Sequence, residues 1–375
     1  MLRISRLIRE ASNGRAGEAR SRGHVVIWNL TSRCNLSCRH CYARASAGSD
    51  ELAPHEARKV IDEIARQDVF VLILSGGEPL LREDLYDLIA YARTQGIFCA
   101  LSTNGTLLGE KQVRSLEESG IGYVGISIDG TRQTHDRFRG KAGAYEASLK
   151  AIRLCRQAGI RVGLRFSLTS LTATGLQAAF ELVEQEDLSK IYISHLNYID
   201  KDMKQLAPKP AQTREVMRFV LAKAVEYADH RDRFREIVTG NNTADGPYLF
   251  LTMKHERPSL APRIHDLLMR QQIDAWRSRL LNIDVRGEVH PDPFCRNVSF
   301  GNVRRTPLRD ILLASKEVPF DSSQESYRLL KGRCGRCGFL HLCRGNSRPR
   351  AFAESNTWWG SDPQCYLTPD ETVIN

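Results

Sequence analysis

The sequence predicts an α/β protein in which a parallel sheet is followed by a small, loop-rich C-terminal domain. From residue 24 to about residue 200, short β-rich apolar runs alternate with stretches of helical periodicity. Strands that are separated by single helices indicate βαβ units and a parallel sheet. From about residue 282, turns become frequent, the density of cysteine rises and little long periodicity remains. Six βα units form either an incomplete barrel or a doubly wound sheet.

The expected strands and helices alternate one by one along the chain. In a barrel of this kind the chemistry lies at the C-terminal ends of the strands, so polar residues that directly follow a strand are the first candidates for a site. The expected strands are His24–Leu30, Val69–Ser75, Ile97–Ser102, Tyr123–Ile128, Arg161–Leu168 and Lys190–His195, and the expected helices lie near residues 54–67, 81–95, 110–119, 145–158 and 172–186.

The chain divides into four expected segments. The first is basic, and its apolar stripe from Leu2 to Ile8 predicts a partly frayed leading helix. Two further helices are expected in the connector, near residues 211–229 and 264–279. A small domain rich in loops, such as the last segment, often needs a metal to hold it together. The segments are a basic N-terminal segment (1–23), a βα core (24–200), a helical connector (201–285) and a C-terminal domain (286–375).

Composition excludes several classes of protein. The 375 residues are 42% hydrophobic and 26% charged, which is typical of a globular protein and excludes wholesale disorder. No run of about 18 apolar residues predicts a membrane span, and no secretory signal is recognisable, so we expect a cytoplasmic protein. The net charge of +10 is compatible with nucleic acid, a membrane surface or an anionic small molecule as partner. Because aromatic residues are not interleaved with the basic ones, we do not expect a nucleic-acid partner.

Three of the ten cysteines, Cys34, Cys38 and Cys41, follow the first expected strand on a loop. Without export, paired disulfides are a poor interpretation and a metal site is the better one. A cubane iron–sulfur cluster normally takes four cysteine ligands, so three thiolates leave one iron open for a substrate or cofactor. The alternative is a zinc knuckle in which His40 supplies the fourth ligand.

The second expected strand ends in the motif Gly76-Gly77-Glu78-Pro79. Two glycines let the backbone approach a ligand closely, and the Glu78 carboxylate offers an acceptor for an ammonium group. Taken alone, the motif is also compatible with an ordinary βα turn.

Short polar side chains follow the next two strands. Ser102 and Asn104 end the third strand, and Ser127 and Asp129 end the fourth. These side chains can bind ribose hydroxyls or a carboxylate, but they are equally good turn and N-cap formers. Arg139 lies further on, and its planar guanidinium suits a carboxylate partner.

A second group of cysteines lies near the C-terminal end. Its spacing, CxxC followed by x5-C and a fourth cysteine 22 residues on, is a strong four-ligand pattern. Zinc and a [4Fe–4S] cluster both fit four thiolates. Cys99 and Cys155 lie in strand and helix patterns, where small buried thiols usually serve packing. The four expected ligands are Cys334, Cys337, Cys343 and Cys365, with Cys295 as a possible extra one.

The CxxxCxxC motif after the first strand of a (βα)6 unit resembles that of the radical S-adenosylmethionine (SAM) enzymes, over residues 24 to about 200. The resemblance implies a partial (β/α)6 barrel and a [4Fe–4S] cluster on Cys34, Cys38 and Cys41, whose open iron binds the amino and carboxylate groups of SAM. Reduction would then release a 5′-deoxyadenosyl radical. The remaining implied cofactor-binding residues are His40, Gly76, Gly77, Glu78, Ser102, Asn104, Ser127, Asp129 and Arg139, with His40 in a position that is usually aromatic.

Joined to such a core, the second cysteine group resembles the SPASM auxiliary-cluster domain, which implies a second [4Fe–4S] cluster. Members with two auxiliary clusters carry a further cysteine four residues after the CxxCx5C run, where this chain has Ser347. We therefore expect one auxiliary cluster, with Cys295 as a spare cysteine or as a ligand in place of Cys365.

The segments around Trp358–Leu367 and Trp28–Leu36 resemble the haem d1 biosynthesis branch of these enzymes. This resemblance implies an anionic tetrapyrrole substrate, 12,18-didecarboxysirohaem, and the removal of two of its propionate side chains, with an electron donor such as flavodoxin or ferredoxin. Arg165 could face the interior of the barrel, and His195 is a candidate axial ligand, proton donor or buried core residue. Two alternatives stay open: a peptide or protein maturase with the same clusters, and a cluster-holding protein that does not use SAM.

Overall fold

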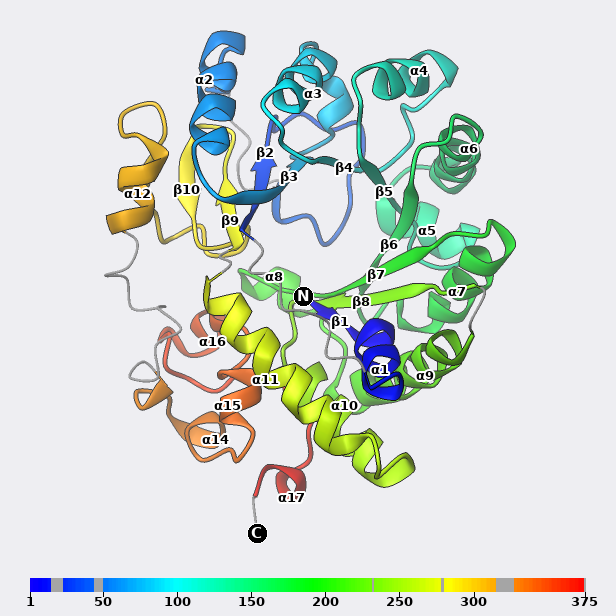
Figure 1. Cartoon of the computed structure of the whole chain (residues 1–375), viewed down its shortest axis with the longest axis vertical. Coiled ribbons are helices and arrows are strands. Elements are labelled where there is room, and N and C mark those ends of the chain that lie inside the picture. Colours follow the sequence, from blue (N-terminus) through cyan, green and yellow to red (C-terminus); the bar gives the residue numbers. More distant parts are fainter. Residues whose placement is uncertain (15–22, 44–49, 231–232, 278–279, 315–326, 374–375) are drawn as a thin grey trace. The chain divides into compact units, whose positions relative to one another are not determined.

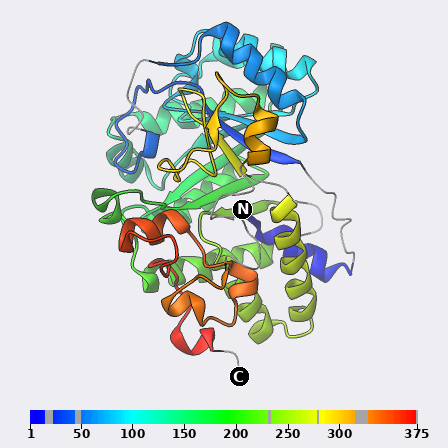
Figure 2. The same ribbon diagram turned by 90° about the vertical axis from the view of Figure 1, so that its left-hand side faces the viewer.

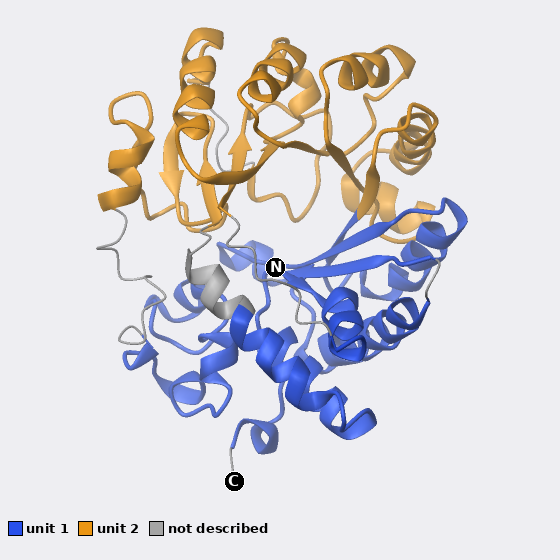
Figure 3. Cartoon of the chain, viewed as in Figure 1, with its two compact units in different colours: residues 1–20, 165–276, 319–375 blue, residues 21–164, 277–318 orange. Residues whose placement is uncertain are grey.

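The computed structural model describes residues 1–14, 23–43, 50–230, 233–277, 280–314 and 327–373. The chain forms two compact units, each assembled from separate stretches of sequence (Figure 3). Unit 1 contains Met1–Arg20, Arg165–Trp276 and Pro319–Asn375, and unit 2 contains Ser21–Leu164 and Arg277–Val318. The four segment boundaries expected from the sequence stay a prediction.

Unit 2 is built on a mainly parallel sheet in the order β5-β4-β3-β2-β9-β10-β11. Neighbouring strands from β5 to β9 run parallel, and β10 runs antiparallel to both of its neighbours. Apolar residues such as Val26, Trp28 and Leu72 are fully buried, as expected for a parallel sheet. The strands are β2 (His24–Asn29), β3 (Val69–Ser75), β4 (Cys99–Thr103), β5 (Tyr123–Ser127), β9 (Leu280–Ile283), β10 (Glu288–His290) and β11 (Gly301–Asn302).

The helices of unit 2 pack one apolar face on its core. In the first of them, the spacing of Ala57, Val60, Ile61 and Ile64 places four buried side chains on one face. The helices are α2 (Pro54–Ala65), α3 (Leu85–Thr94), α4 (Glu110–Glu118), α5 (Arg132–Arg139), α6 (Ala144–Gln157) and α12 (Leu308–Ala314), with a short 3-10 turn, η2 (Pro79–Leu81), after β3 (Figure 1).

Unit 1 contains β1 (Leu2–Arg3), β7 (Lys190–His195) and β8 (Glu236–Gly240), and the last residues of β6 (Val162–Leu168). β7 and β8 are parallel, and β1 pairs antiparallel with β8. Its longer helices are α1 (Ile4–Ser12), α7 (Leu176–Gln185), α9 (Pro210–Asp229), α10 (Asp245–Glu256) and α11 (Ala261–Arg277), with a short turn η3 (Ala173–Gly175) and helix α8 (Lys201–Lys204).

The C-terminal part of unit 1 is made of short helices joined by loops (orange to red in Figure 2). These helices are α14 (Gly332–Gly335), α15 (Leu340–Cys343), α16 (Arg348–Ser355) and α17 (Pro369–Thr372). The loop-rich C-terminal region that the sequence predicts is therefore confirmed. Of the helices in the described ranges, none is both long and apolar enough to cross a lipid bilayer.

All six expected strands are present, as β2 to β7, and the five helices expected between them are present as α2, α3, α4, α6 and α7. The leading helix differs from the expectation: Ile4, Leu7, Ile8 and Ala11 of α1 are buried, so its described turns are packed and not frayed. Residues 15–22 of the basic N-terminal segment lie outside the described residues. Strands β8 and β9 within 201–285, and helix α5, were not expected.

Candidate active site and auxiliary cysteine site

The loop that carries Cys34, Cys38 and Cys41, called the first cysteine loop below, follows β2 in unit 2. Its backbone is fixed to the end of α5, because the Ser37 and Arg39 amides donate to the carbonyl oxygens of Arg139 and Phe138, each at 3.2 Å. Cys34 is exposed, Cys38 is buried and Cys41 is half-buried, and all are free thiols. Burial raises the pKa of Cys34, and the charges of Cys38 and Cys41 raise it further, so the three thiols act on one another.

Three free thiols on one loop are a suitable donor set for three irons of a cubane. Within the described ranges, no three His, Cys, Asp or Glu side chains are arranged to hold one metal ion. In a cubane each thiolate binds a different iron, so its three sulfur atoms need not converge on one point. The His40 ring stacks on Phe138, with ring centres 4.4 Å apart, and burial lowers the pKa of His40 to about 3. The ring is therefore neutral and packed against an aromatic neighbour.

The glycines after β3 let the first cysteine loop pass close to the strand end. The Gly77 amide donates to the Thr31 carbonyl at 2.7 Å, and the Glu78 amide donates to the Arg33 carbonyl at 2.8 Å. A Cβ atom on Gly77 would lie 2.2 Å from the Arg33 carbonyl oxygen, and Gly76 has a φ of +143°. The backbone of residues 31–33 therefore occupies the space next to Gly76 and Gly77.

The Glu78 carboxylate is fully buried and is used within the chain. It accepts hydrogen bonds from the Thr103 hydroxyl (2.7 Å), the Asn104 amide (2.9 Å) and the Leu80 amide (3.2 Å). Burial raises the pKa of Glu78 to about 7, although these donors oppose the shift. The carboxylate thus ties the end of β3 to the end of β4, and this positioning contact was not anticipated from the sequence.

Asp129 and Arg139 form a buried ion pair beside the first cysteine loop. Arg139 Nε donates to Asp129 Oδ2 at 2.7 Å, and Arg139 Nη1 lies 3.7 Å from Cys38 Sγ. Burial raises the pKa of the Cys38 thiol, and the Arg139 guanidinium opposes that rise. The structure therefore places Arg139 where its charge stabilises a Cys38 thiolate, with Asp129 holding the guanidinium in place.

The other strand-end candidates of unit 2 lie near the same loop. Asn104 Nδ2 donates to Asn35 Oδ1 at 2.9 Å, while Asn104 Oδ1 accepts from the Thr106 amide at 2.8 Å. Asn104 is therefore both a turn former and a contact of the first cysteine loop. Ser102 and Ser127 are half-buried at the ends of β4 and β5.

In unit 1, Arg165 and Tyr192 share the less buried face of β6 and β7. The Arg165 guanidinium lies 4.8 Å from the centre of the Tyr192 ring, a cation–π contact. Tyr192 needs a glycine at residue 240 of β8, because a Cβ there would lie 2.1 Å from its hydroxyl oxygen. This face carries a positive charge and a phenol hydroxyl, which suit an anionic ligand.

His195, at the end of β7, is buried and is held by an acid that sequence analysis missed. Its Nε2 lies 3.1 Å from Asp245 Oδ2, and the Tyr366 hydroxyl donates to Asp245 Oδ1 at 2.7 Å. Asp245 was not among the candidate residues predicted from the sequence. Its partners lie 50 and 121 positions away, so a local pattern could not reveal them.

The second cysteine group lies in the short helices and loops of unit 1. Cys334 and Cys343 are buried, and Cys337 and Cys365 are half-buried. Burial raises the pKa of the Cys343 thiol, and the charges of the other three thiols raise it further, so the four act on one another. Four neighbouring thiols are a suitable donor set for a [4Fe–4S] cluster. Cys295 belongs to unit 2, where its thiol donates to Asp292 Oδ2 at 3.3 Å.

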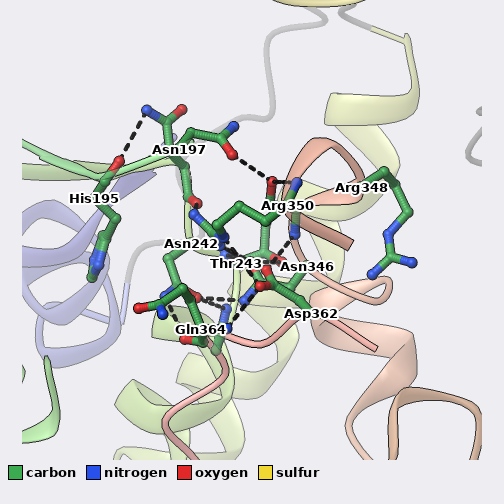
Figure 4. A network of polar contacts seen from close by, with 12 residues as sticks. His195, Asn197, Asn242, Thr243, Asn346, Arg348, Arg350, Asp362 and Gln364 are labelled. Carbon is green, nitrogen blue, oxygen red and sulfur yellow. Dashed lines mark hydrogen bonds and ion pairs between the residues drawn. The ribbon is translucent and has the colours of Figure 1, made fainter. Parts of the chain in front are cut away.

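A buried arginine, Arg350, anchors the second cysteine group within unit 1 (Figure 4). Its Nη2 and Nε donate to the Asp362 carboxylate at 2.7 and 3.0 Å, and Nη1 donates to the carbonyl oxygens of Leu196 and Asn241 at 3.0 and 2.7 Å. Ser347, which caps α16, donates through its hydroxyl to Asn197 Oδ1 at 2.8 Å. These bonds tie the segment between Cys343 and Cys365 to the residues that follow β7 and β8.

Comparison with known proteins identifies the class. The model of the radical SAM superfamily matches residues 28–176, and this chain belongs to that superfamily. The pre-heme d1 synthase of Dinoroseobacter shibae is 43% identical, over 93% of this chain and 87% of that protein. The Fe-coproporphyrin III synthase of Methanosarcina barkeri is 38% identical, over 92% of this chain and 88% of that protein.

Solved structures confirm the fold. The structure of anSMEcpe with bound AdoMet matches with a TM-score of 0.70 at 18% identity, over 92% of this chain and 94% of that one. Streptococcus suis SuiB bound to its precursor peptide SuiA also matches with a TM-score of 0.70, at 14% identity, over 91% of this chain and 75% of that one. The chain is thus a radical SAM enzyme with an α/β fold and a C-terminal extension, and its family uses SAM and a [4Fe–4S] cluster.

Proposed function

We propose that this enzyme acts in haem d1 biosynthesis and removes two propionate side chains from 12,18-didecarboxysirohaem, towards the oxo groups of haem d1. The observation that carries this proposal is the 43% identity to a pre-heme d1 synthase over 93% of the chain. The net charge of +10 supports it, because the substrate carries several carboxylates.

Residues of unit 2 hold the radical-generating cofactors in this proposal. Cys34, Cys38 and Cys41 bind the cluster, and the strand-end residues bind SAM. When bound, these groups supply a 5′-deoxyadenosyl radical that abstracts hydrogen from a propionate chain. Arg139 stabilises the Cys38 thiolate, and the buried Glu78 holds the ends of β3 and β4 in register around the first cysteine loop.

Residues of unit 1 bind the macrocycle and receive the electron in this proposal. Arg165 supplies the positive charge for a substrate carboxylate. Cys334, Cys337, Cys343 and Cys365 would hold one auxiliary [4Fe–4S] cluster, which would supply an acceptor for the electron left by side-chain fragmentation. His195 is an axial ligand to the substrate iron or a proton donor. We further propose that the enzyme is cytoplasmic and that a flavodoxin or ferredoxin reduces it.

The proposal is tested by anaerobic reconstitution with iron and sulfide, followed by addition of SAM, dithionite and 12,18-didecarboxysirohaem. We expect 5′-deoxyadenosine and a pigment whose mass shows the loss of both propionate chains. Formation of 5′-deoxyadenosine with unchanged pigment would contradict the substrate assignment and favour a peptide or protein maturase. A Cys34→Ala variant is the control, because it should form neither product.

A further inference from the structure

Residues 241–245, the β8–α10 loop, contribute to the polar network of unit 1, in which Figure 4 labels Asn242 and Thr243. Asn241 begins the loop with a left-handed φ of 67°, which is uncommon for a residue other than glycine. Its Nδ2 donates to Ser194 Oγ at 2.8 Å, and its carbonyl oxygen accepts from Arg350. The loop is therefore fixed at the end of β7 by its first residue.

The next two residues of the loop hold the backbone at the second cysteine group. Thr243 Oγ1 donates to the Cys343 carbonyl oxygen at 2.5 Å, and Asn242 Nδ2 donates to the Gln364 carbonyl oxygen at 3.1 Å. Asn346 connects these contacts, since its Nδ2 donates to Asn242 Oδ1 at 2.7 Å and its Oδ1 accepts from the Thr243 amide at 2.8 Å. The loop thus sets the backbone at Cys343 and immediately before Cys365.

Asp245 ends the loop with a fully buried carboxylate. The Tyr366 hydroxyl donates to its Oδ1 at 2.7 Å, and His195 Nε2 lies 3.1 Å from its Oδ2. The position of Asp245 in the first turn of α10 favours its negative charge. One carboxylate therefore orients His195 and the residue that follows Cys365.

We propose that the β8–α10 loop is a positioning element which fixes the auxiliary cluster and His195 together, and that the Asp245 carboxylate tunes the reduction potential of that cluster. The inference rests on the auxiliary cluster of the proposed function and deepens it. Asp245 reaches the cluster site through Tyr366, which directly follows Cys365 and donates to Asp245 Oδ1 at 2.7 Å. A negative charge near a cluster disfavours its reduction, because the added electron brings a further negative charge. The loop thereby couples the redox state of the auxiliary cluster to His195, the last residue of β7.

The test uses the full chain with Cys34, Cys38 and Cys41 changed to Ala, so that only the auxiliary cluster is bound. In this background Asp245→Asn keeps the size of the side chain and removes its charge. We expect iron content to stay at one cluster per chain and the midpoint potential, followed by EPR in a redox titration, to become more positive. Asp266→Asn is the matched control: the Asp266 side chain is 73% exposed on α11, and its charge is screened by water.

A second variant tests positioning without a change of charge. Thr243→Val removes the bond to the Cys343 carbonyl, and we expect the cluster to lose iron to a chelator several-fold faster. Thr252→Val is its control, because the Thr252 hydroxyl donates to the Tyr248 carbonyl of its own helix, and its rate should not change. The inference would be overturned, with the auxiliary cluster left in place, by two results together. Asp245→Asn would bind one cluster per chain with an unshifted midpoint potential, and Thr243→Val would lose iron to the chelator at the unchanged rate. A background protein that binds no iron would overturn the auxiliary cluster itself.

Discussion

Replacing Arg350 by Met should destabilise the protein strongly, because it leaves the Asp362 carboxylate buried without its cation. Both side chains of the pair are 0% exposed. Removing one partner of a buried ion pair costs about 3–5 kcal/mol. With an unfolding entropy of roughly 0.8 kcal/mol/K for a chain of this length, the loss corresponds to a fall in Tm of about 4–6 °C.

The measurement is thermal unfolding followed by circular dichroism, with Asp362→Asn and the double variant Arg350→Met/Asp362→Asn beside it. The carboxylate accepts from the Ser347 amide through Oδ2 at 2.8 Å and from the Gln364 amide through Oδ1 at 2.9 Å, and the single side-chain oxygen that Asp362→Asn leaves can keep only one of these two bonds. The double variant should therefore be less destabilised than the sum of the two single ones, since no unpaired charge remains.

Lys204→Met provides the matched control in the same region. Lys204 pairs with Glu354 of α16, but the two side chains are 46% and 37% exposed, so the loss should be under about 1 kcal/mol. An Arg350→Met protein that melts within about 1 °C of the wild type would show that the burial argument is wrong. Strict additivity in the double variant would show that the two groups do not depend on each other.

Three further predictions concern single residues. Since the folded state keeps the Glu78 proton up to a pKa of about 7, the wild type should lose about 3 kcal/mol of stability as pH rises from 4.5 to 7, whereas Glu78→Gln should not. Urea unfolding at about pH 5 and about pH 8 checks this, and parallel curves for both proteins would contradict it. Gly77→Ala should displace the first cysteine loop and lower the iron bound there, because its Cβ would lie 2.2 Å from the Arg33 carbonyl oxygen; an unchanged iron count would refute this steric argument. Arg165→Met should weaken tetrapyrrole binding about tenfold in an absorbance titration, and equal affinity would remove Arg165 from the site.

Much of the fold follows from hydrophobic periodicity, and the exceptions have identifiable causes. Strands β2 to β7 are predicted correctly, because each is a short apolar run set off by a helical pattern. Strand β8 was missed since its five residues, EIVTG, lie in a mixed segment with no alternation. Helix α5, RQTHDRFR, was missed because it is mostly polar and carries no apolar stripe that is long enough to recognise.

The candidate sites show the same division between local and tertiary information. Cysteine spacing is local, so the two cysteine groups could be found from the sequence. The contacts of Glu78 with Thr103, of Arg139 with Cys38 and of His195 with Asp245 join distant positions, and a single sequence carries no sign of them. The roles of these residues in binding and catalysis stay predictions.

The discontinuous make-up of the two units constrains how the protein is synthesised. Unit 2 needs residues 277–318 to complete its sheet, and unit 1 needs residues 319–375 in addition to the first 20. On the ribosome, the early part of unit 1 must therefore wait until residues 319–375 have emerged. During that delay the buried side chains of Asn242 and Asp245 lack their partners Gln364 and Tyr366, so we expect nascent chains to depend on a chaperone and C-terminal truncations to aggregate.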